Sequence, residues 1–140
     1  MSEAGWEHWE HDADIGIRAC AATREQLYEQ FAEALTAVVT DPASVRAEQD
    51  IAISCEAPDD ALLLVDWLNA LIFEMATRNM VFGRWRVALE GRRLTAVAWG
   101  ERVDRRRHEP AVEVKGATYT ALTVTKDSDG VWRGQCVVDV

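Results

Sequence analysis

The sequence contains few of the features that mark membrane, secreted or disulfide-rich proteins. No apolar run approaches the roughly 20 residues that a membrane-spanning helix needs. The first residues, Met1 to Gly5, lack the basic and apolar segments of a signal peptide. Only three cysteines occur, and Cys20, Cys55 and Cys136 are widely spaced in apolar surroundings. This spacing indicates neither a disulfide framework nor a zinc knuckle, so we expect reduced core cysteines and a cytoplasmic protein.

Motifs for nucleotide binding and nucleophilic catalysis are also missing. Because the chain has no P-loop, we do not expect it to bind GTP by itself. No Ser/His/Asp or Cys/His set stands out. His8, His11 and His108 are possible zinc ligands, but no cysteine pair supports such a site. No repeat, low-complexity segment or linker divides the chain, so we expect residues 1–140 to form a single domain.

Charged residues are abundant but unevenly distributed. The chain has a formal net charge of −9. Residues 1–80 carry 4 arginines and 16 acids, whereas residues 81–140 carry 11 basic residues and 8 acids. An acidic protein repels phosphate, so direct binding to nucleic acid is not expected. The acidic part suits a basic protein surface or a metal ion, although a solvated helix face explains most of these charges equally well.

Two segments have the apolar periodicity of helices. The first begins at a capping box, Thr23 to Gln26, and continues to about Val39, where Thr40-Asp41-Pro42 ends it. The second begins at Pro58-Asp59-Asp60, and its apolar stripe runs from Leu62 to Met75. We expect this second helix to form the core of the domain.

Alternating apolar and polar residues predict strands in the rest of the chain. The expected strands cover residues 6–10, 15–21, 51–55, 84–89, 94–99, 111–117, 119–125 and 131–138. Turn signals at 90–92 and 127–130 favour hairpins. These elements predict an α+β fold, with the two helices packed on one side of a mostly antiparallel sheet.

A candidate site begins with the stretch His11-Asp12-Ala13-Asp14, which directly precedes an apolar strand. Carboxylates directly before an apolar strand are poorly suited to packing, so we expect these residues to serve a binding site. A second acid, Asp139, is the penultimate residue, and Val140 adds a terminal carboxylate. If the fold brings the chain ends together, these hard oxygens suit calcium, magnesium or manganese better than zinc. The alternative is a turn cap for Asp14 and a frayed tail for Asp139.

Other polar residues are candidates for supporting roles. His11 is expected to hydrogen-bond a loop or to orient a site carboxylate. Lys115 and Glu101 could form a buried ion pair or contact a partner. The loop from Gly100 to Pro110 is long and rich in arginine at residues 102–107, which often indicates function, but its role stays open.

Five segments together resemble the archease family, and their order and spacing extend over nearly the whole chain. They are His11-Asp12-Ala13-Asp14-Ile15-Gly16-Ile17, Leu62-Leu63-Leu64-Val65-Asp66-Trp67-Leu68-Asn69, Gly100-Glu101, Val114-Lys115-Gly116-Ala117-Thr118-Tyr119 and Asp139-Val140. The family's opening motif is usually His-Thr-Ala-Asp, so Asp12 replaces a threonine. Many members have histidine where this chain has Thr120, so that histidine's role cannot be carried over.

The resemblance implies an accessory protein of the RtcB-type tRNA-splicing RNA ligase. Such a protein promotes ligase guanylylation and multiple turnover, in tRNA splicing or RNA repair, and catalyses no reaction of its own. The family's metal site then corresponds to Asp14, Asp139 and Val140, with calcium as the implied ion. His11, Asp12, Glu101 and Lys115 are candidates for supporting this site or contacting the ligase. A metal-dependent hydrolase using Asp12, Asp14 and Asp139, or a generic protein-interaction module, remains an alternative.

Overall fold

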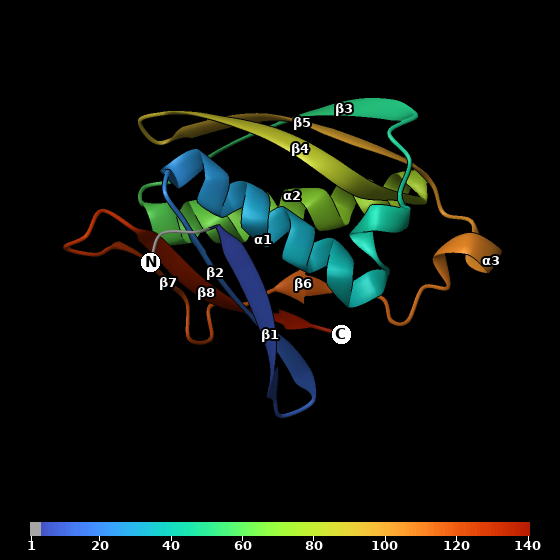
Figure 1. Ribbon diagram of the computed structural model, residues 1–140, viewed down its shortest axis with the longest axis horizontal. Coiled ribbons are helices and arrows are strands. Elements are labelled where there is room, and N and C mark those ends of the chain that lie inside the picture. Colours follow the sequence, from blue (N-terminus) through green and yellow to red (C-terminus); the bar gives the residue numbers. More distant parts are fainter. Residues whose placement is uncertain (1–3) are drawn as a thin grey trace.

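The computed structural model describes residues 4–140 and places two helices between two antiparallel sheets (Figure 1). One sheet has the strand order β1-β2-β8-β6, with β7 also paired to β8, and the other has the order β3-β5-β4. The first sheet consists of β1 (Gly5–His11), β2 (Asp14–Ala21), β6 (Gly116–Ala117), β7 (Thr123–Lys126) and β8 (Trp132–Asp139). The second consists of β3 (Gln49–Glu56), β4 (Met80–Glu90) and β5 (Arg93–Arg102). The helical segments are α1 (Arg24–Val39), α2 (Asp60–Arg78), the short α3 (Arg105–His108) and the 3-10 turn η1 (Pro42–Ser44).

The predicted α+β class and antiparallel pairing are confirmed, and each sheet carries the two long helices on one of its faces. The structure differs from the prediction in having two sheets. Alternation along a strand shows which side chains face the core, but it does not identify the strand with which it pairs. The β4–β5 hairpin turns at Gly91-Arg92, as predicted, with Gly91 at a φ of 61°.

The segment between α3 and β8 forms less strand than expected. Of the predicted strands 111–117 and 119–125, only Gly116–Ala117 and Thr123–Lys126 pair in the sheet. The remaining backbone groups find other partners. The amide of Ala111 donates to the Val39 carbonyl at the end of α1, at 2.8 Å, and Ala121 has a φ of 55°. Alternation of apolar residues does not distinguish an extended segment that crosses the end of a helix from a strand that pairs in a sheet.

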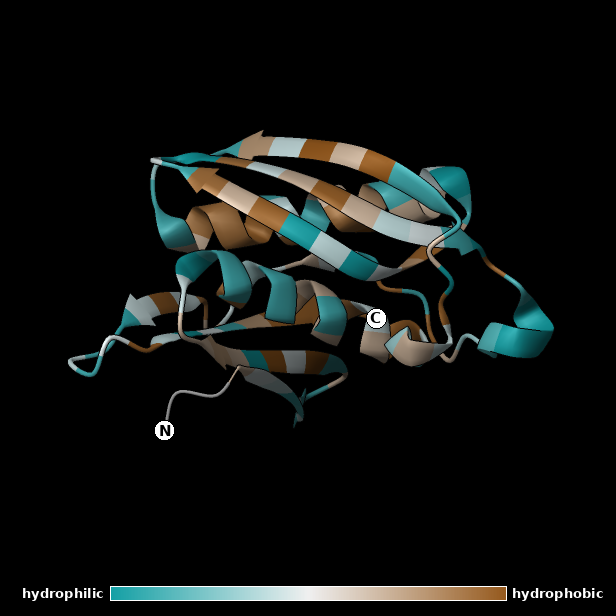
Figure 2. Cartoon of the chain, turned by 45° about the horizontal axis from the view of Figure 1, so that its top comes forward, coloured by the Kyte–Doolittle hydropathy of each residue, from teal (hydrophilic) through white to brown (hydrophobic). Residues whose placement is uncertain are grey.

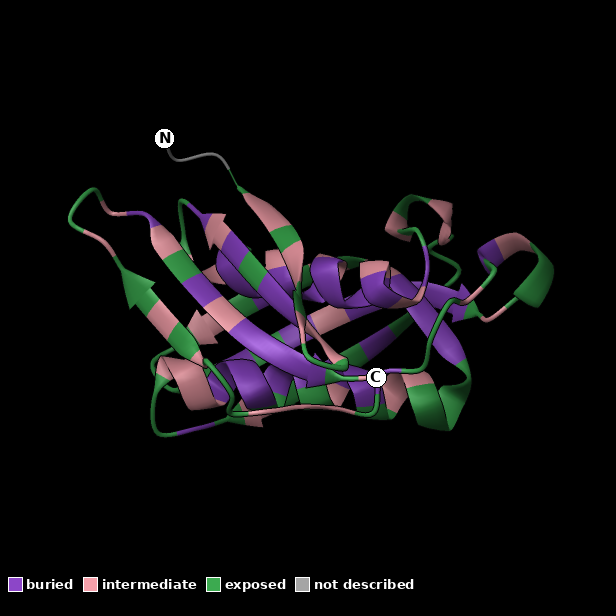
Figure 3. Cartoon of the chain, turned by 90° about the horizontal axis from the view of Figure 1, so that it is seen from below, coloured by how far each residue is buried: buried purple, intermediate pink, exposed green. Residues whose placement is uncertain are grey.

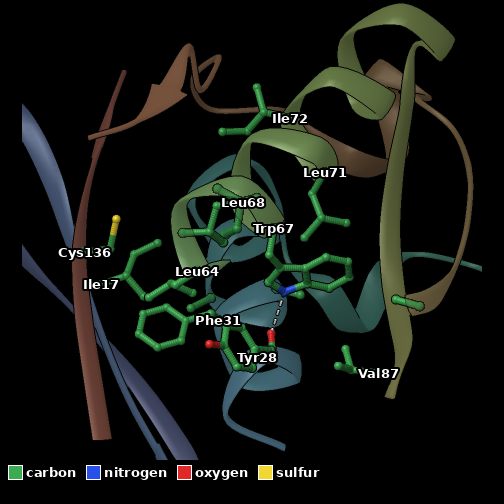
Figure 4. Close-up of a cluster of buried hydrophobic side chains, with 14 of the residues drawn as sticks. Ile17, Tyr28, Phe31, Leu64, Trp67, Leu68, Leu71, Ile72, Val87 and Cys136 are labelled. Atoms are coloured by element: carbon green, nitrogen blue, oxygen red, sulfur yellow. Dashed lines mark hydrogen bonds between the residues drawn. The ribbon is translucent and has the colours of Figure 1, made fainter. Parts of the chain in front are cut away.

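The core lies between the sheets and is formed largely by α1 and α2 (Figure 4). Trp67 is fully buried, and its indole N–H donates to the Tyr28 carbonyl at 2.9 Å. Phe31 of α1 packs against Gly134 of β8, where an added Cβ would lie 2.9 Å from the ring. The prediction that the second helix forms the core of the domain is confirmed.

The second helix begins at an N-cap, Asp59, whose carboxylate accepts from the Leu62 amide at 2.8 Å. We expect Asp59→Ala to lower the free energy of unfolding by about 1 kcal/mol, because the first turn loses this acceptor. Urea denaturation should detect the change. Asp59→Asn is the matched control, since asparagine caps about as well, and an equal loss in both variants would contradict a capping role.

Within residues 4–140, no helix is both long and apolar enough to cross a membrane. No disulfide bond links the three cysteines. Cys136 is buried and Cys55 is half-buried, and burial raises the pKa of both thiols to about 11. The absence of a signal peptide was inferred partly from residues 1–3, which lie outside the described residues.

Candidate functional site

The register of the larger sheet brings the two ends of the chain together. β2 runs antiparallel to β8, and the ladder between them ends at the pair of Ile15 with Val138. The same register, continued by one residue, sets Asp14 opposite Asp139. His11 of β1 pairs with Asp14, and Gly116 of β6 pairs with Asp139. One row across four strands therefore holds His11, Asp14 and Asp139.

Strand alternation turns Asp14 and Asp139 away from the helices. Their neighbours Ile15 and Val138 pack in or against the core, so the two acids belong to the outer face. The C-terminal half of β8 is buried in the middle of the sheet, and Val140 also packs against the core (Figure 3). The chain end is therefore anchored, which excludes the frayed tail considered for Asp139.

The facing carboxylates have the chemistry of a cation site. Within residues 4–140, neither Asp14 nor Asp139 forms a side-chain hydrogen bond or an ion pair, so Asp14 is not a turn cap. Like charges placed directly opposite each other on a sheet destabilise it, and a bound cation would remove that repulsion. Hard oxygens from two carboxylates and from the main-chain end at Val140 suit calcium.

Two side chains alone do not complete such a site. No group of three or more His, Cys, Asp or Glu side chains in the described part of the chain is arranged to hold a metal. A cation at Asp14 and Asp139 would therefore also need the oxygens of Val140, water or a partner. The hydrolase alternative required Asp12, Asp14 and Asp139 to bind a metal together, and these three do not form such a group.

Asp12 and Lys115 flank this row. Asp12 lies in the β1–β2 turn with a φ of 53°, and its side chain is 96% exposed. Its carboxylate lies 3.9 Å from Nδ1 of His11, which is too long for a hydrogen bond. The backbone amide of Lys115 donates to the Asp139 carbonyl at 2.8 Å, and the Lys115 side chain is exposed. Lys115 is thus close to the row through its main chain.

Glu101 lies in the other sheet and has a different environment. Glu101 is only 3% exposed. Its carboxylate accepts hydrogen bonds from both terminal nitrogens of Arg107, one of them at 2.8 Å. The Arg46 amide donates to the same carboxylate at 2.6 Å. These hydrogen bonds, that of Arg107 above all, lower the pKa of Glu101 to about 2. The ion pair considered between Glu101 and Lys115 is not formed.

His108 completes this network. Its Nδ1 accepts from the Asp104 amide at 2.8 Å, so its proton is on Nε2, which donates to Glu101 at 3.1 Å. His8 instead contacts the Ala34 carbonyl at 2.8 Å, and His11 lies at the β1–β2 turn. The structure therefore does not bring the three histidines together as zinc ligands.

Two exposed aromatic side chains were not recognised from the sequence. Phe73 of α2 is 63% exposed and Tyr119, two residues after β6, is 68% exposed. Asn69, one turn before Phe73, accepts from the Ala117 amide at 2.9 Å and joins the exposed side of α2 to β6. The sequence did contain a signal that Phe73 is exposed, because Phe73 follows Asp66 and Asn69 on the polar face of the helix.

The chain is similar to known proteins over nearly its whole length. The model of the "Archease protein family (MTH1598/TM1083)" matches residues 6–140. "Protein archease" of Thermococcus gammatolerans is 38% identical over 139 residues, covering 96% of this chain and 98% of the relative. The corresponding protein of Pyrococcus furiosus is 36% identical with the same coverage.

Solved structures have the same fold. Protein 1598 of Methanobacterium thermoautotrophicum superposes with a TM-score of 0.79 at 28% identity, covering 97% of this chain and 99% of that one. A Thermotoga maritima protein described as an archease and possible chaperone superposes with a TM-score of 0.68 at 20% identity, covering 96% of each chain. That second likeness concerns the fold alone. The family model and the curated relatives together show that this chain belongs to the archease family.

Proposed function

We propose that this chain activates an RtcB-type tRNA-splicing RNA ligase, and that Asp14, Asp139 and Val140 hold a divalent cation, calcium in the family, for that purpose. The observation that carries the proposal is the strand register that sets Asp14 opposite Asp139. Family membership supports an accessory rather than a catalytic role. The ligase joins RNA ends after attaching GMP to its own histidine, and the proposed role of this chain is to promote that attachment.

The residues around the chain ends have distinct parts in this proposal. Asp14 and Asp139 supply carboxylate oxygens, and Val140 supplies main-chain oxygens beside them. A bound calcium ion provides the positive charge that offsets the two carboxylates. Lys115 adds an exposed cation next to Asp139, suited to an acidic or phosphate group of the partner.

The exposed aromatic residues supply the contact with the ligase. Large exposed apolar side chains rimmed by polar residues mark interaction surfaces. Phe73 lies on α2, which the Asn69 hydrogen bond joins to β6, and Tyr119 follows β6 by two residues. β6 in turn pairs with the strand that carries Asp139. We infer that the docking face and the cation site form one continuous surface.

The test is to incubate the ligase with GTP labelled on its α-phosphate and with less than one equivalent of this chain. We expect faster formation of the covalent ligase–GMP adduct, and more than one RNA joined per ligase when RNA is added. Chelation of calcium should remove the effect. Release of phosphate or nucleoside by the chain without ligase would instead indicate a hydrolase, and no change in either assay would leave a generic interaction module.

A further inference from the structure

Arginine is concentrated in one short part of this acidic chain. Residues 84–107 contain 8 of the 13 arginines and only 3 acids, although the whole chain has a net charge of −9. This segment comprises most of β4, β5 and α3. We define the arginine surface as Arg46, Arg84, Arg86, Arg102, Arg105 and Arg106.

The first part of the arginine surface is a hollow at the end of β5, with a volume of about 650 Å³. Arg46, Arg102, Arg105 and Arg106 line it together with Arg107 and three acids. Two of these acids are already occupied: Glu101 pairs with Arg107, and Asp104 accepts the amides at 106 and 107. The hollow therefore has an excess of positive charge.

The guanidinium groups of this hollow are available to a ligand. Arg46, Arg102, Arg105 and Arg106 are exposed, and within residues 4–140 none of them forms an ion pair. The guanidinium fork donates two parallel hydrogen bonds to a phosphate, and it is less strongly hydrated than an ammonium group. The hollow is thus suited to phosphate groups.

The second part of the arginine surface is the outer face of the three-stranded sheet. The core residues of β5, Ala96 and Ala98, face the helices, so Trp99 faces outward. Arg84 is opposite Trp99 in the register, and its guanidinium carbon lies 4.8 Å from the ring centroid. Arg86 lies 5.8 Å from the same centroid. These cation–π contacts hold both arginines over the face that the long helices leave uncovered (Figure 1).

The two parts are continuous along β5. Trp99 is followed by Gly100, whose carbonyl accepts from the Glu48 amide at 3.0 Å. Glu101 and Arg102 come next, and both line the hollow. The hydrophilic α3 extends beyond this end of the sheet (Figure 2). The Cα atoms of Arg84 and Arg86 are separated by one strand repeat, about 6.6 Å. This spacing is close to that of successive phosphates in an extended nucleic-acid strand.

We propose that the arginine surface binds the phosphate backbone of single-stranded RNA. An extended row of guanidinium groups beside an indole matches the grooves that bind single strands, whereas an acidic protein patch requires no such regular row. The choice of RNA rests on the proposed function, in which the partner joins RNA ends. Two exposed acids lie beside this surface, Asp50 opposite Trp99 and Glu48 in the hollow, and the six arginines outnumber them. Charges are screened beyond about 10 Å at 0.1 M salt, so acids on the other sheet contribute little here.

The proposal predicts direct binding of the full chain, without ligase, to a fluorescein-labelled 20-nucleotide oligouridylate, measured by anisotropy at several salt concentrations. Replacing Arg102, Arg105 and Arg106 by glutamine should weaken binding at least tenfold. The slope of log affinity against log salt should fall by about 2, since each phosphate contact contributes about 0.7 for single strands. The pair Arg84→Gln and Arg86→Gln should lower the slope by about 1.4.

The matched control is the pair Arg18→Gln and Arg133→Gln on the other sheet. Arg18 also lies over an indole, that of Trp9 at 4.1 Å, but it pairs with Glu7, and Arg133 pairs with Asp127. Binding by this control should stay within twofold of the parent. Thermal melting checks that each variant is folded. If the triple variant unfolds, RNA binding by the variant with Arg84→Gln and Arg86→Gln tests the proposal instead.

Three results would overturn the proposal: no binding by the parent chain at low salt, equal loss in the control, or competition by polyglutamate as strong as by RNA. Guanylylation of the ligase is measured separately without RNA. The arginine variants are expected to stimulate it normally, so that failure of RNA binding and failure of the proposed ligase activation are distinguishable.

Discussion

Asp14→Asn and Asp139→Asn are each expected to reduce stimulation of ligase guanylylation at least tenfold. Asparagine keeps the shape of the side chain but removes one of only two carboxylates in the row, and a divalent cation binds neutral oxygens much less strongly. The assay is the initial rate of ligase–GMP formation with and without each variant. Full stimulation by either variant would refute the proposed site.

The same two variants separate loss of the cation from loss of the fold. Without calcium they should melt at or above the temperature of the parent, because each substitution removes a like-charged cross-strand pair. Excess calcium should stabilise the parent, by about 2.7 kcal/mol at a concentration one hundred times its Kd, and leave the variants unchanged. Asp129→Asn is the control, since this exposed acid lies in the β7–β8 turn at the opposite end of β8.

Glu101→Gln is expected to lower the free energy of unfolding by about 2–4 kcal/mol at neutral pH. The substitution removes the negative charge that Arg107 faces. It also places an amide NH2 group, a hydrogen-bond donor, next to groups that are themselves donors. Chemical denaturation measures the loss. Glu48→Gln, at an exposed acid lining the same hollow, should change stability by less than about 0.5 kcal/mol.

The contribution of Glu101 should also depend on pH. Because folding lowers the pKa of Glu101 to about 2, its stabilisation is fully present above the ordinary carboxyl pKa and is lost as the pH falls toward 2. The difference in stability between the parent and Glu101→Gln should therefore narrow between about pH 4.5 and pH 2. A difference that stays constant over this range would mean that the charge of Glu101 does not stabilise the fold.

The Glu101 network illustrates a limit of sequence reasoning. The charged loop at 102–107 was recognised as unusual, but its partner was not, because Glu101, Arg46 and Arg107 meet only when the end of β5 packs beside η1 and α3. The pairing considered with Lys115 was chemically reasonable, but Lys115 adjoins the other sheet. Net charge has a similar limit, since it averages over surfaces that the fold separates.

The sequence by itself determined the two long helices, the cap of the first at Thr23, the turns at 90–92 and 127–130, and the family. These features depend on contacts within a few residues, where periodicity and turn chemistry act directly. The tertiary structure alone decided that the strands form two sheets, that the strands carrying Asp14 and Asp139 are neighbours, and that Arg84 and Arg86 lie over Trp99. Such arrangements depend on pairing between distant strands, for which alternation gives the buried side of each strand but not its neighbour.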